Sequence, residues 1–197
     1  HLSERSHWLF DLEATGLHTT RERVTQIAGI PIERGRIVES EAFVQFVYPG
    51  AGVEIPQVVQ DLTGITLAML QDAPPLAEAW GMCVRAAGGA DVWIGQSVFE
   101  FDVPLLEAEF VRHAMPLELP AILDSVVMAT YLLGPPQNRW STSALIDTFA
   151  VDISGLRRHD ALDDVKILGR ILLPMLERIR IQGDASTRSY EQLALDD

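Results

Sequence analysis

Two carboxylates stand at the end of an apolar segment near the start of the chain. Asp11 directly follows the apolar residues 8–10, and Glu13 comes two positions later, before the chain breaks at Gly16. In a β-strand alternate side chains share a face, so both acids would project from the same side. Such a pair repels itself unless a cation lies between the two, and hard divalent ions such as Mg²⁺ favour carboxylate oxygens. The segment therefore predicts either a metal site or two solvated charges where a strand runs into a turn.

A third acid, Asp102, stands where a short apolar strand and its loop give way to a helix. Pro104 would lie in the first turn of that helix. An acid directly before such a turn is a normal helix cap. Taken alone, Asp102 is therefore interpreted first as a capping residue and only second as a catalytic one.

The fourth acid and a histidine fall together in the segment 157–165. Asp164 borders the apolar stripe of a predicted helix, three residues after Ala161 and four before Leu168. An acid beside a buried face needs a partner. His159 precedes the helix, so it can approach the same space from a loop; the alternative is an exposed loop histidine.

These residues together predict a hydrolytic site. All four acids lie at strand ends or early helix positions, and sites in α/β sheets assemble at the carboxyl ends of strands. Four carboxylates can hold two divalent ions about 3.5–4 Å apart, which clamps the attacking and leaving oxygens of a phosphodiester. A histidine at the rim can take the proton of the attacking water, because imidazoles as a class titrate near neutral pH.

The elements that position these residues follow from apolar periodicity and from turn signals. A strand begins at Trp8, and further strands are predicted over 24–33, 37–48, 92–95 and 121–123. Helices are predicted over 56–62, 67–71, 75–87, 104–114, 125–133, 141–149 and 160–180. Short turns make the first three strands an antiparallel meander, and later strands alternate with helices. The expected fold is α/β: a mixed five-stranded sheet flanked by helices.

Length and composition indicate one domain over residues 1–182 and a polar, mobile tail over 183–197. The chain has 197 residues, 48% of them hydrophobic, and Cys83 is its single cysteine. No intramolecular disulfide can form, which favours a reducing, cytoplasmic compartment. No signal peptide is visible, and the longest apolar stretch, 121–133, is too short to span a bilayer, so no membrane partner is expected.

The net charge of −13 argues against binding nucleic acid through a broad basic surface. It does not exclude a small site at which bound metal ions carry the positive charge to the phosphates.

Taken in order, the motifs resemble those of the DEDDh-type 3′–5′ exonucleases of the DnaQ-like superfamily, which include polymerase proofreading subunits. The matching segments are FDLEATG at 10–16, TGIT at 63–66, the stretch 95–106 with FDVPLL at its end, and HDALDD at 159–164. Histidine rather than tyrosine at 159 selects the DEDDh branch. The resemblance covers residues 8–173 and implies the ribonuclease H-like fold.

The resemblance also implies roles for the acids. Asp11, Glu13, Asp102 and Asp164 would be the ligands of two divalent ions, Mg²⁺ or Mn²⁺, and His159 would be the general base. All five would then be catalytic residues.

The candidate substrate-binding residues come partly from the resemblance and partly from apolar side chains that we expect near the cleft. Leu12, Thr15 and Gly16 match family positions that grip the 3′-terminal nucleotide. The candidate substrate-binding residues are Leu12, Thr15, Gly16, Leu17, Ile65, Met69, Ser97 and Phe101. Ser97 departs from the family, which commonly has asparagine there, and its hydroxyl has a shorter reach than an amide.

Three functions remain open at this point. The first is a metal-dependent 3′–5′ exonuclease that releases nucleoside 5′-monophosphates from single-stranded or frayed DNA, in repair or in proofreading. The second is an exonuclease of the same family that acts on RNA or short oligonucleotides. The third is a non-catalytic module of a replication or repair complex, whose acidic surface would suit a basic partner. A polymerase or repair-complex partner is possible, and the sequence decides neither for a monomer nor for a homodimer.

Overall fold

A mixed β-sheet with helices on both faces forms the body of the protein. The structure, a computed structural model, describes residues 5–136 and 139–193. Within those residues the sheet has six strands in the order β3-β2-β1-β5-β6, with β4 also paired to β2. The strands are β1 His7–Ala14, β2 Val24–Glu33, β3 Arg36–Ile37, β4 Phe43–Phe46, β5 Val92–Gly95 and β6 Ile122–Asp124.

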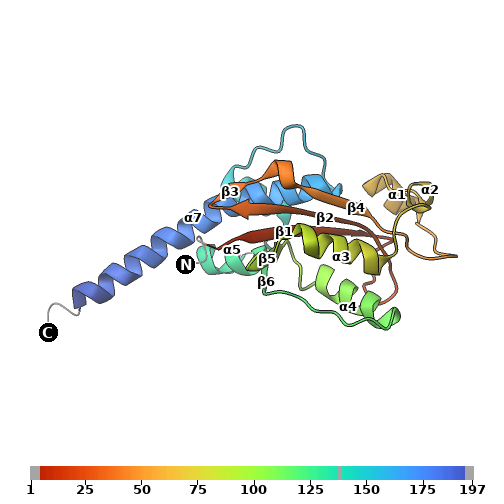
Figure 1. The fold of residues 1–197 in the computed structure, drawn as a ribbon. Coiled ribbons are helices and arrows are strands. Elements are labelled where there is room, and N and C mark those ends of the chain that lie inside the picture. The colour runs from red at the N-terminus through yellow and green to blue at the C-terminus, as the bar shows by residue number, and fades with distance from the viewer. Residues whose placement is uncertain (1–4, 137–138, 194–197) are drawn as a thin grey trace.

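Most of the helices divide between the two faces of this sheet, and two short ones pack in a separate small cluster (Figure 1). They are α1 Gln57–Thr63, α2 Leu67–Leu70, α3 Leu76–Ala86, α4 Asp102–Arg112, α5 Ser125–Leu133, α6 Thr142–Phe149 and α7 Ala161–Leu193. Side chains of α3 and α4 pack in one core cluster, and those of α5, α6 and α7 pack in the other. The predicted order of strands and helices, and the α/β class, are therefore confirmed.

The pairing of the strands is also as predicted, but their number is not. β2 pairs antiparallel with β1, β3 and β4, whereas β1–β5 and β5–β6 are parallel. The predicted third strand, 37–48, is split by a 3₁₀ helix at Glu39–Glu41 into β3 and β4. Residues 38–42 lie opposite only residues 30–31 of β2, so the ladder cannot continue through them. The sheet consequently has a sixth strand.

The two faces of β1 have different surroundings. Trp8, Phe10 and Leu12 pack with α3 and α4, whereas Leu9 packs with α7 on the other side. Asp11 and Glu13 continue the face of Leu9, because side chains alternate along a strand. The two acids therefore point to the side of the sheet that α7 covers.

The last helix is longer than predicted. Periodicity predicted a helix over 160–180 and a tail from Gly183, but α7 runs to Leu193, and its end extends away from the sheet (Figure 1). Residues 184–193 contain no proline or glycine, and a single glycine costs only about 1 kcal/mol of helix stability. Residues 194–197 of the predicted tail lie outside the described residues. The mobility of the tail and the single-domain division stay predictions.

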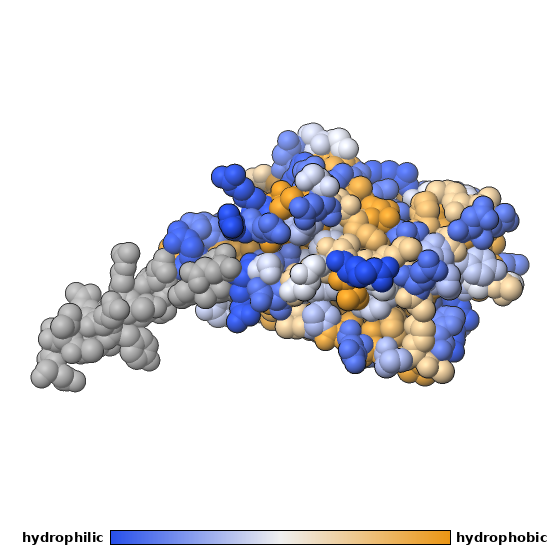
Figure 2. All heavy atoms as spheres, in the orientation of Figure 1, coloured by the Kyte–Doolittle hydropathy of each residue, from blue (hydrophilic) through white to orange (hydrophobic). Residues whose placement is uncertain are grey.

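Hydrophilic and hydrophobic residues are interleaved over the face of the molecule drawn in Figure 2. In the described part of the chain, no helix has the length and apolar character needed to cross a membrane. The compartment in which the protein works stays a prediction.

Candidate active site

Three carboxylates meet where β1 passes under α7. Oxygen atoms of Asp11, Glu13 and Asp164 lie within 4.8 Å of one another. Ala161 and Val165 of α7 are buried against the sheet, so Asp164, between them in sequence, is brought to the acids of β1. The strand and the helix thus bring together residues that are about 150 positions apart in the chain.

Asp102 joins this group from the first turn of α4. Its side chain is 4% exposed, and its Oδ1 accepts a hydrogen bond of 3.2 Å from the backbone N–H of Leu12. The N-cap position of α4 is Phe101, and no side chain caps the helix there. The capping interpretation of Asp102 is therefore wrong: Asp102 is not the N-cap residue, and its carboxylate accepts the backbone N–H of Leu12 on β1.

The acids raise one another's pKa values. Burial, followed by the charge of Asp102, raises the pKa of Asp11 well above its ordinary value, and Glu13 and Asp164 add to this shift. Burial and then Asp164 raise the pKa of Glu13 to about 7. Burial raises the pKa of Asp102 to about 8, although backbone N–H groups donate to it. Each shift comes first from burial, and the charges of neighbouring carboxylates add to it.

One arginine contacts this group directly. Arg158 donates from Nε to Oδ1 of Asp164 at 2.5 Å and lowers the pKa of Asp11. The charges of Arg157 and then Arg158 lower the pKa of Glu13, and neither rise is cancelled. Clustered oxygen donors with surplus negative charge match the preferences of hard divalent cations. The residues present therefore fit a divalent metal ion.

The carboxylates open into a cleft of about 750 Å³. His159 lines it from an exposed loop, with its backbone N–H bonded to Oδ2 of Asp164 at 2.8 Å. His159 has a φ of 64°, in the left-handed region that histidine adopts more readily than most residues. The hydrogen bond and the backbone conformation together hold the imidazole at the rim of the cleft.

Six of the eight predicted substrate-binding residues line the cleft. They are Leu12, Thr15, Gly16, Leu17, Ser97 and Phe101. Ile65 is buried instead in a small cluster with Ile55 and Leu70, and Met69 is exposed on α2 outside the cleft lining. The preceding helix, α1, takes their place: Val58, Val59 and Leu62 line this wall, and Val58 and Leu62 are largely exposed.

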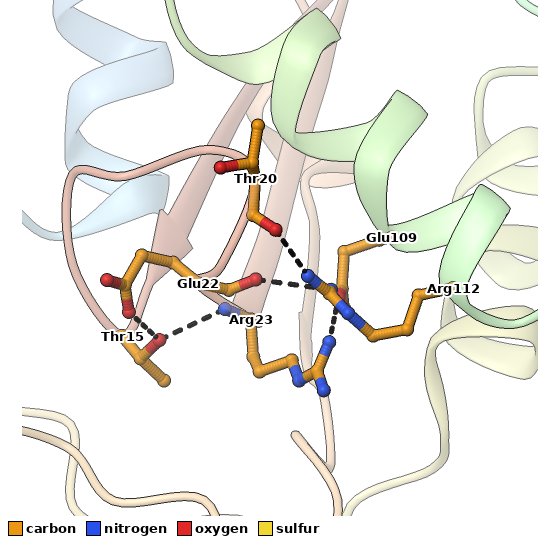
Figure 3. Close-up of polar contacts among 6 residues, drawn as sticks. All are labelled: Thr15, Thr20, Glu22, Arg23, Glu109 and Arg112. Carbon is orange, nitrogen blue, oxygen red and sulfur yellow. Dashed lines mark hydrogen bonds and ion pairs between the residues drawn. The ribbon is translucent and has the colours of Figure 1, made fainter.

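The segment after β1, several residues of which line the cleft, is held in place by polar contacts (Figure 3). Thr15 donates its hydroxyl proton to the Glu22 carboxylate at 2.6 Å and accepts the backbone N–H of Arg23 at 3.0 Å. The backbone carbonyl of Thr20 accepts a hydrogen bond of 2.9 Å from Arg112 of α4. These contacts fix the loop that carries Gly16 and Leu17.

Both arginines of this network converge on one buried acid. Glu109, 2% exposed, accepts a hydrogen bond of 3.0 Å from Arg23 and forms an ion pair with Arg112 (Figure 3). Sequence reasoning missed this cluster, because Glu109 has an ordinary helix position and its partners are distant in sequence.

A fifth acid, also missed, organises the second motif. Asp124, at the end of β6, accepts the backbone N–H groups of Ser97 at 3.1 Å, Phe99 at 3.4 Å and Val126 at 2.8 Å. Ser97 has a φ of 55°, a conformation that asparagine adopts more readily than most residues. A single aspartate thus caps α5 and holds the loop that leads to Asp102.

A sheet of this topology, with carboxylates at the end of its central strand, defines a ribonuclease H-like nuclease. A family model described as "Exonuclease" matches residues 9–172. The chain belongs to this exonuclease family. The resemblance to an exonuclease family, and with it the expectation of an enzyme, is confirmed.

The curated relatives are much longer proteins. "DNA polymerase III PolC-type" of Caldanaerobacter subterraneus subsp. tengcongensis is 27% identical over 188 residues, which cover 95% of this chain and 13% of the relative. "DNA polymerase III subunit epsilon-like protein" of Rhodobacter capsulatus is 31% identical over 176 residues, covering 89% of this chain and 24% of the relative. The chain thus spans less than a quarter of the length of these two relatives.

Two solved structures show the same fold. The nuclease domain of 3′hExo, a DEDDh family member bound to rAMP, superposes with a TM-score of 0.77 at 15% identity, covering 88% of this chain and 92% of that one. Exonuclease X in complex with 5′ overhanging duplex DNA gives a TM-score of 0.65 at 22% identity, covering 87% of this chain and 91% of that one.

Proposed function

We propose that this domain removes nucleotides from the 3′ end of single-stranded or frayed DNA and releases nucleoside 5′-monophosphates. The observation that carries the proposal is the meeting of Asp11, Glu13 and Asp164 within 4.8 Å, with Asp102 beside them and His159 at the rim of the same cleft.

The roles of the residues follow from their positions. Asp11, Glu13, Asp102 and Asp164 would hold two divalent ions, Mg²⁺ or Mn²⁺. Bound ions of this kind activate water and stabilise the charge on the leaving oxygen. His159, at the rim and close to Asp164, would accept the proton of the attacking water.

The cleft walls would orient the terminal nucleotide. The loop that contains Gly16 and Leu17 is held to α4, so it offers a fixed surface to the last base and sugar. Apolar side chains of α1, chiefly Val58 and Leu62, would pack against a base without hydrogen-bonding its edges. Such contacts accept any base, as an exonuclease requires.

The test is a time course on single-stranded oligonucleotides labelled at the 5′ or the 3′ end, with Mg²⁺, Mn²⁺ or EDTA. We expect a ladder that shortens from the 3′ end, requires metal and falls about 10²–10⁴-fold in His159→Ala. His113→Ala, which removes an exposed histidine outside the carboxylate group, is the matched control for general effects of substitution on the fold. Metal-independent cleavage, or an unchanged rate in His159→Ala, would contradict the proposal.

RNA is the alternative substrate, and the neighbour bound to rAMP favours testing it. Nothing in the sequence indicated a group dedicated to the 2′-hydroxyl, so DNA remains the proposed substrate. The rates on matched DNA and RNA strands decide between the two: a higher kcat/KM on RNA would replace DNA in the proposal.

The biological setting is proposed from the relatives. Both are named as DNA polymerase III proteins or as an epsilon-like subunit, so proofreading beside a polymerase is a natural role. Co-purification with a replicative polymerase tests this role, and activity in its absence would favour a free repair nuclease. A non-catalytic module is disfavoured because the complete acid set and His159 meet in one site.

A further inference from the structure

The cleft offers few cations to a polyanionic strand. Of the residues described at its walls, Arg139 and Arg158 are the only arginines, and no lysine is among them. Arg158 is held by Asp164, inside the carboxylate group. The chain has a net charge of −13. Of the two arginines described at the cleft walls, Arg139 is therefore the one that is not bonded to the metal-site carboxylates.

Arg139 has a partner that a ligand can displace. Its guanidinium lies 2.6 Å from the carboxylate of Glu100, and the two side chains are 58% and 67% exposed. Ion pairs this exposed contribute little to stability, because water screens both charges. A phosphate can accept two parallel hydrogen bonds from an arginine, so it competes well with one exposed carboxylate.

The backbone next to Arg139 is fixed. Gln96 donates from Nε2 to the carbonyl of Trp140 at 2.9 Å and accepts the hydroxyl proton of Ser125. The indole of Trp140 donates to the carbonyl of Gly134 at 3.2 Å. Arg139 is thus presented from an anchored wall of the cleft, which reduces the ordering needed to bind a ligand.

We propose that Arg139 binds a backbone phosphodiester of the substrate strand, other than the one being hydrolysed, and that Glu100 occupies the guanidinium until the strand enters. The inference rests on the proposed function, and it makes Arg139 a determinant of substrate length. A mononucleotide ester has no second phosphate for this arginine, whereas an oligonucleotide does.

The first test compares Arg139→Gln with Arg5→Gln on a short oligothymidylate, a matched RNA and the 4-nitrophenyl ester of thymidine 5′-monophosphate. Arg5 is the matched control: it is also 58% exposed, pairs with exposed Asp91, and precedes β1 at the end remote from the carboxylates. We expect KM for the oligonucleotides to rise about 5- to 10-fold in Arg139→Gln, as for loss of one charged contact. The rise for the ester should be several-fold smaller, and Arg5→Gln should match the wild type.

Salt dependence gives a second readout. Loss of one phosphate contact should reduce the slope of log(kcat/KM) against log[salt] by about 0.7 on single strands. Glu100→Gln, which removes the competing carboxylate, should lower KM in the wild type and have no effect in Arg139→Gln. Arg139→Lys should lie between the wild type and Arg139→Gln, because lysine keeps the charge without the paired donors.

Binding separates this inference from the proposed function. Fluorescence anisotropy of the labelled oligonucleotide, with Ca²⁺ in place of Mg²⁺, measures affinity without turnover. Arg139-dependent affinity without cleavage in Mg²⁺ or Mn²⁺ would overturn the proposed activity and leave the phosphate contact standing. Equal affinity and equal salt slope in the wild type and Arg139→Gln would overturn the inference itself, even in an active enzyme. If Arg139→Gln loses affinity for only one of the two oligonucleotides, DNA or RNA, that oligonucleotide is the strand whose phosphate Arg139 binds.

Discussion

The carboxylates of the cleft, three of them half-buried, and the buried Glu109 are balanced differently by the charges around them. Glu109 is enclosed by Arg23 and Arg112, so two positive charges face one negative charge (Figure 3). At the other group, Asp11, Glu13, Asp102 and Asp164 have one directly bonded arginine, Arg158. The pKa values of Asp11, Glu13 and Asp102 rise as a consequence of burial and of their mutual repulsion.

The difference separates a structural site from a functional one. A buried charge that its neighbours neutralise fixes the elements that carry those neighbours, here α4 and the loop of Gly16. A partly buried group of acids without enough neutralising partners destabilises the metal-free fold and favours binding of a cation. Substitutions should therefore have opposite effects on stability and activity at the two groups.

The largest effect is expected at the unbalanced group. Asp11→Asn should lower the metal-dependent exonuclease rate by about 10³-fold, since a metal ligand contributes several kcal/mol to the transition state. The free energy of unfolding of the metal-free protein should not fall, because a neutral amide avoids the burial cost and the repulsion that raise the pKa of Asp11. Rates in Mg²⁺ and urea unfolding in EDTA measure the two effects. Asp72→Asn, at an exposed turn, is the control; a large loss of stability in Asp11→Asn would contradict the comparison.

The balanced group should behave in the opposite way. Glu109→Gln leaves two guanidiniums with a neutral partner, and we expect it to lower the free energy of unfolding by about 3 kcal/mol. The loop of Gly16 should loosen as well, which raises KM more than it lowers kcat. The exposed Glu107→Gln, on the same helix, should change neither quantity. Wild-type stability in Glu109→Gln would show that the cluster is not structural.

The third effect concerns pH and needs no substitution. Burial raises the pKa of Glu13 to about 7 and that of Asp102 to about 8, so the native state holds protons that the unfolded chain releases near pH 4. The free energy of unfolding of the metal-free protein should therefore fall as pH rises from about 4 to about 8. Saturating Mg²⁺ replaces the protons and should flatten this dependence. Urea unfolding across that range, with EDTA or Mg²⁺, measures it; a rise with pH in EDTA would have the wrong sign.

Much of the fold was predictable because its signals are local. The strands Val24–Glu33 and Val92–Gly95 and the helix Ser125–Leu133 have the predicted bounds, since apolar runs between turn residues define them. The split of 37–48 was not predictable, because it depends on the register against β2. The extension of α7 was missed because a polar, weakly patterned segment can be helix or coil.

Some residues of the candidate site were also predictable from local signals, and others were not. The types and order of Asp11, Glu13, Asp102, His159 and Asp164 could be interpreted from the motifs alone. Residues that act through geometry, such as Asp124 and Arg158, carry no comparable signal. Apolarity predicted that Ile65 and Met69 line the cleft. Ile65 is instead buried in a separate small cluster, and Met69 is exposed on α2.

By itself the sequence determined which chemical groups this protein has and which local elements carry them, because strand alternation, helix periodicity and motif order are properties of neighbouring residues. Only the tertiary structure decided which charges are balanced and which are not. Glu109 and Asp102 are both buried acids on α4, and their difference comes from what the chain brings against them. One meets two arginines, and the other meets more carboxylates, since burial and Coulomb interactions depend on distance in space rather than along the chain.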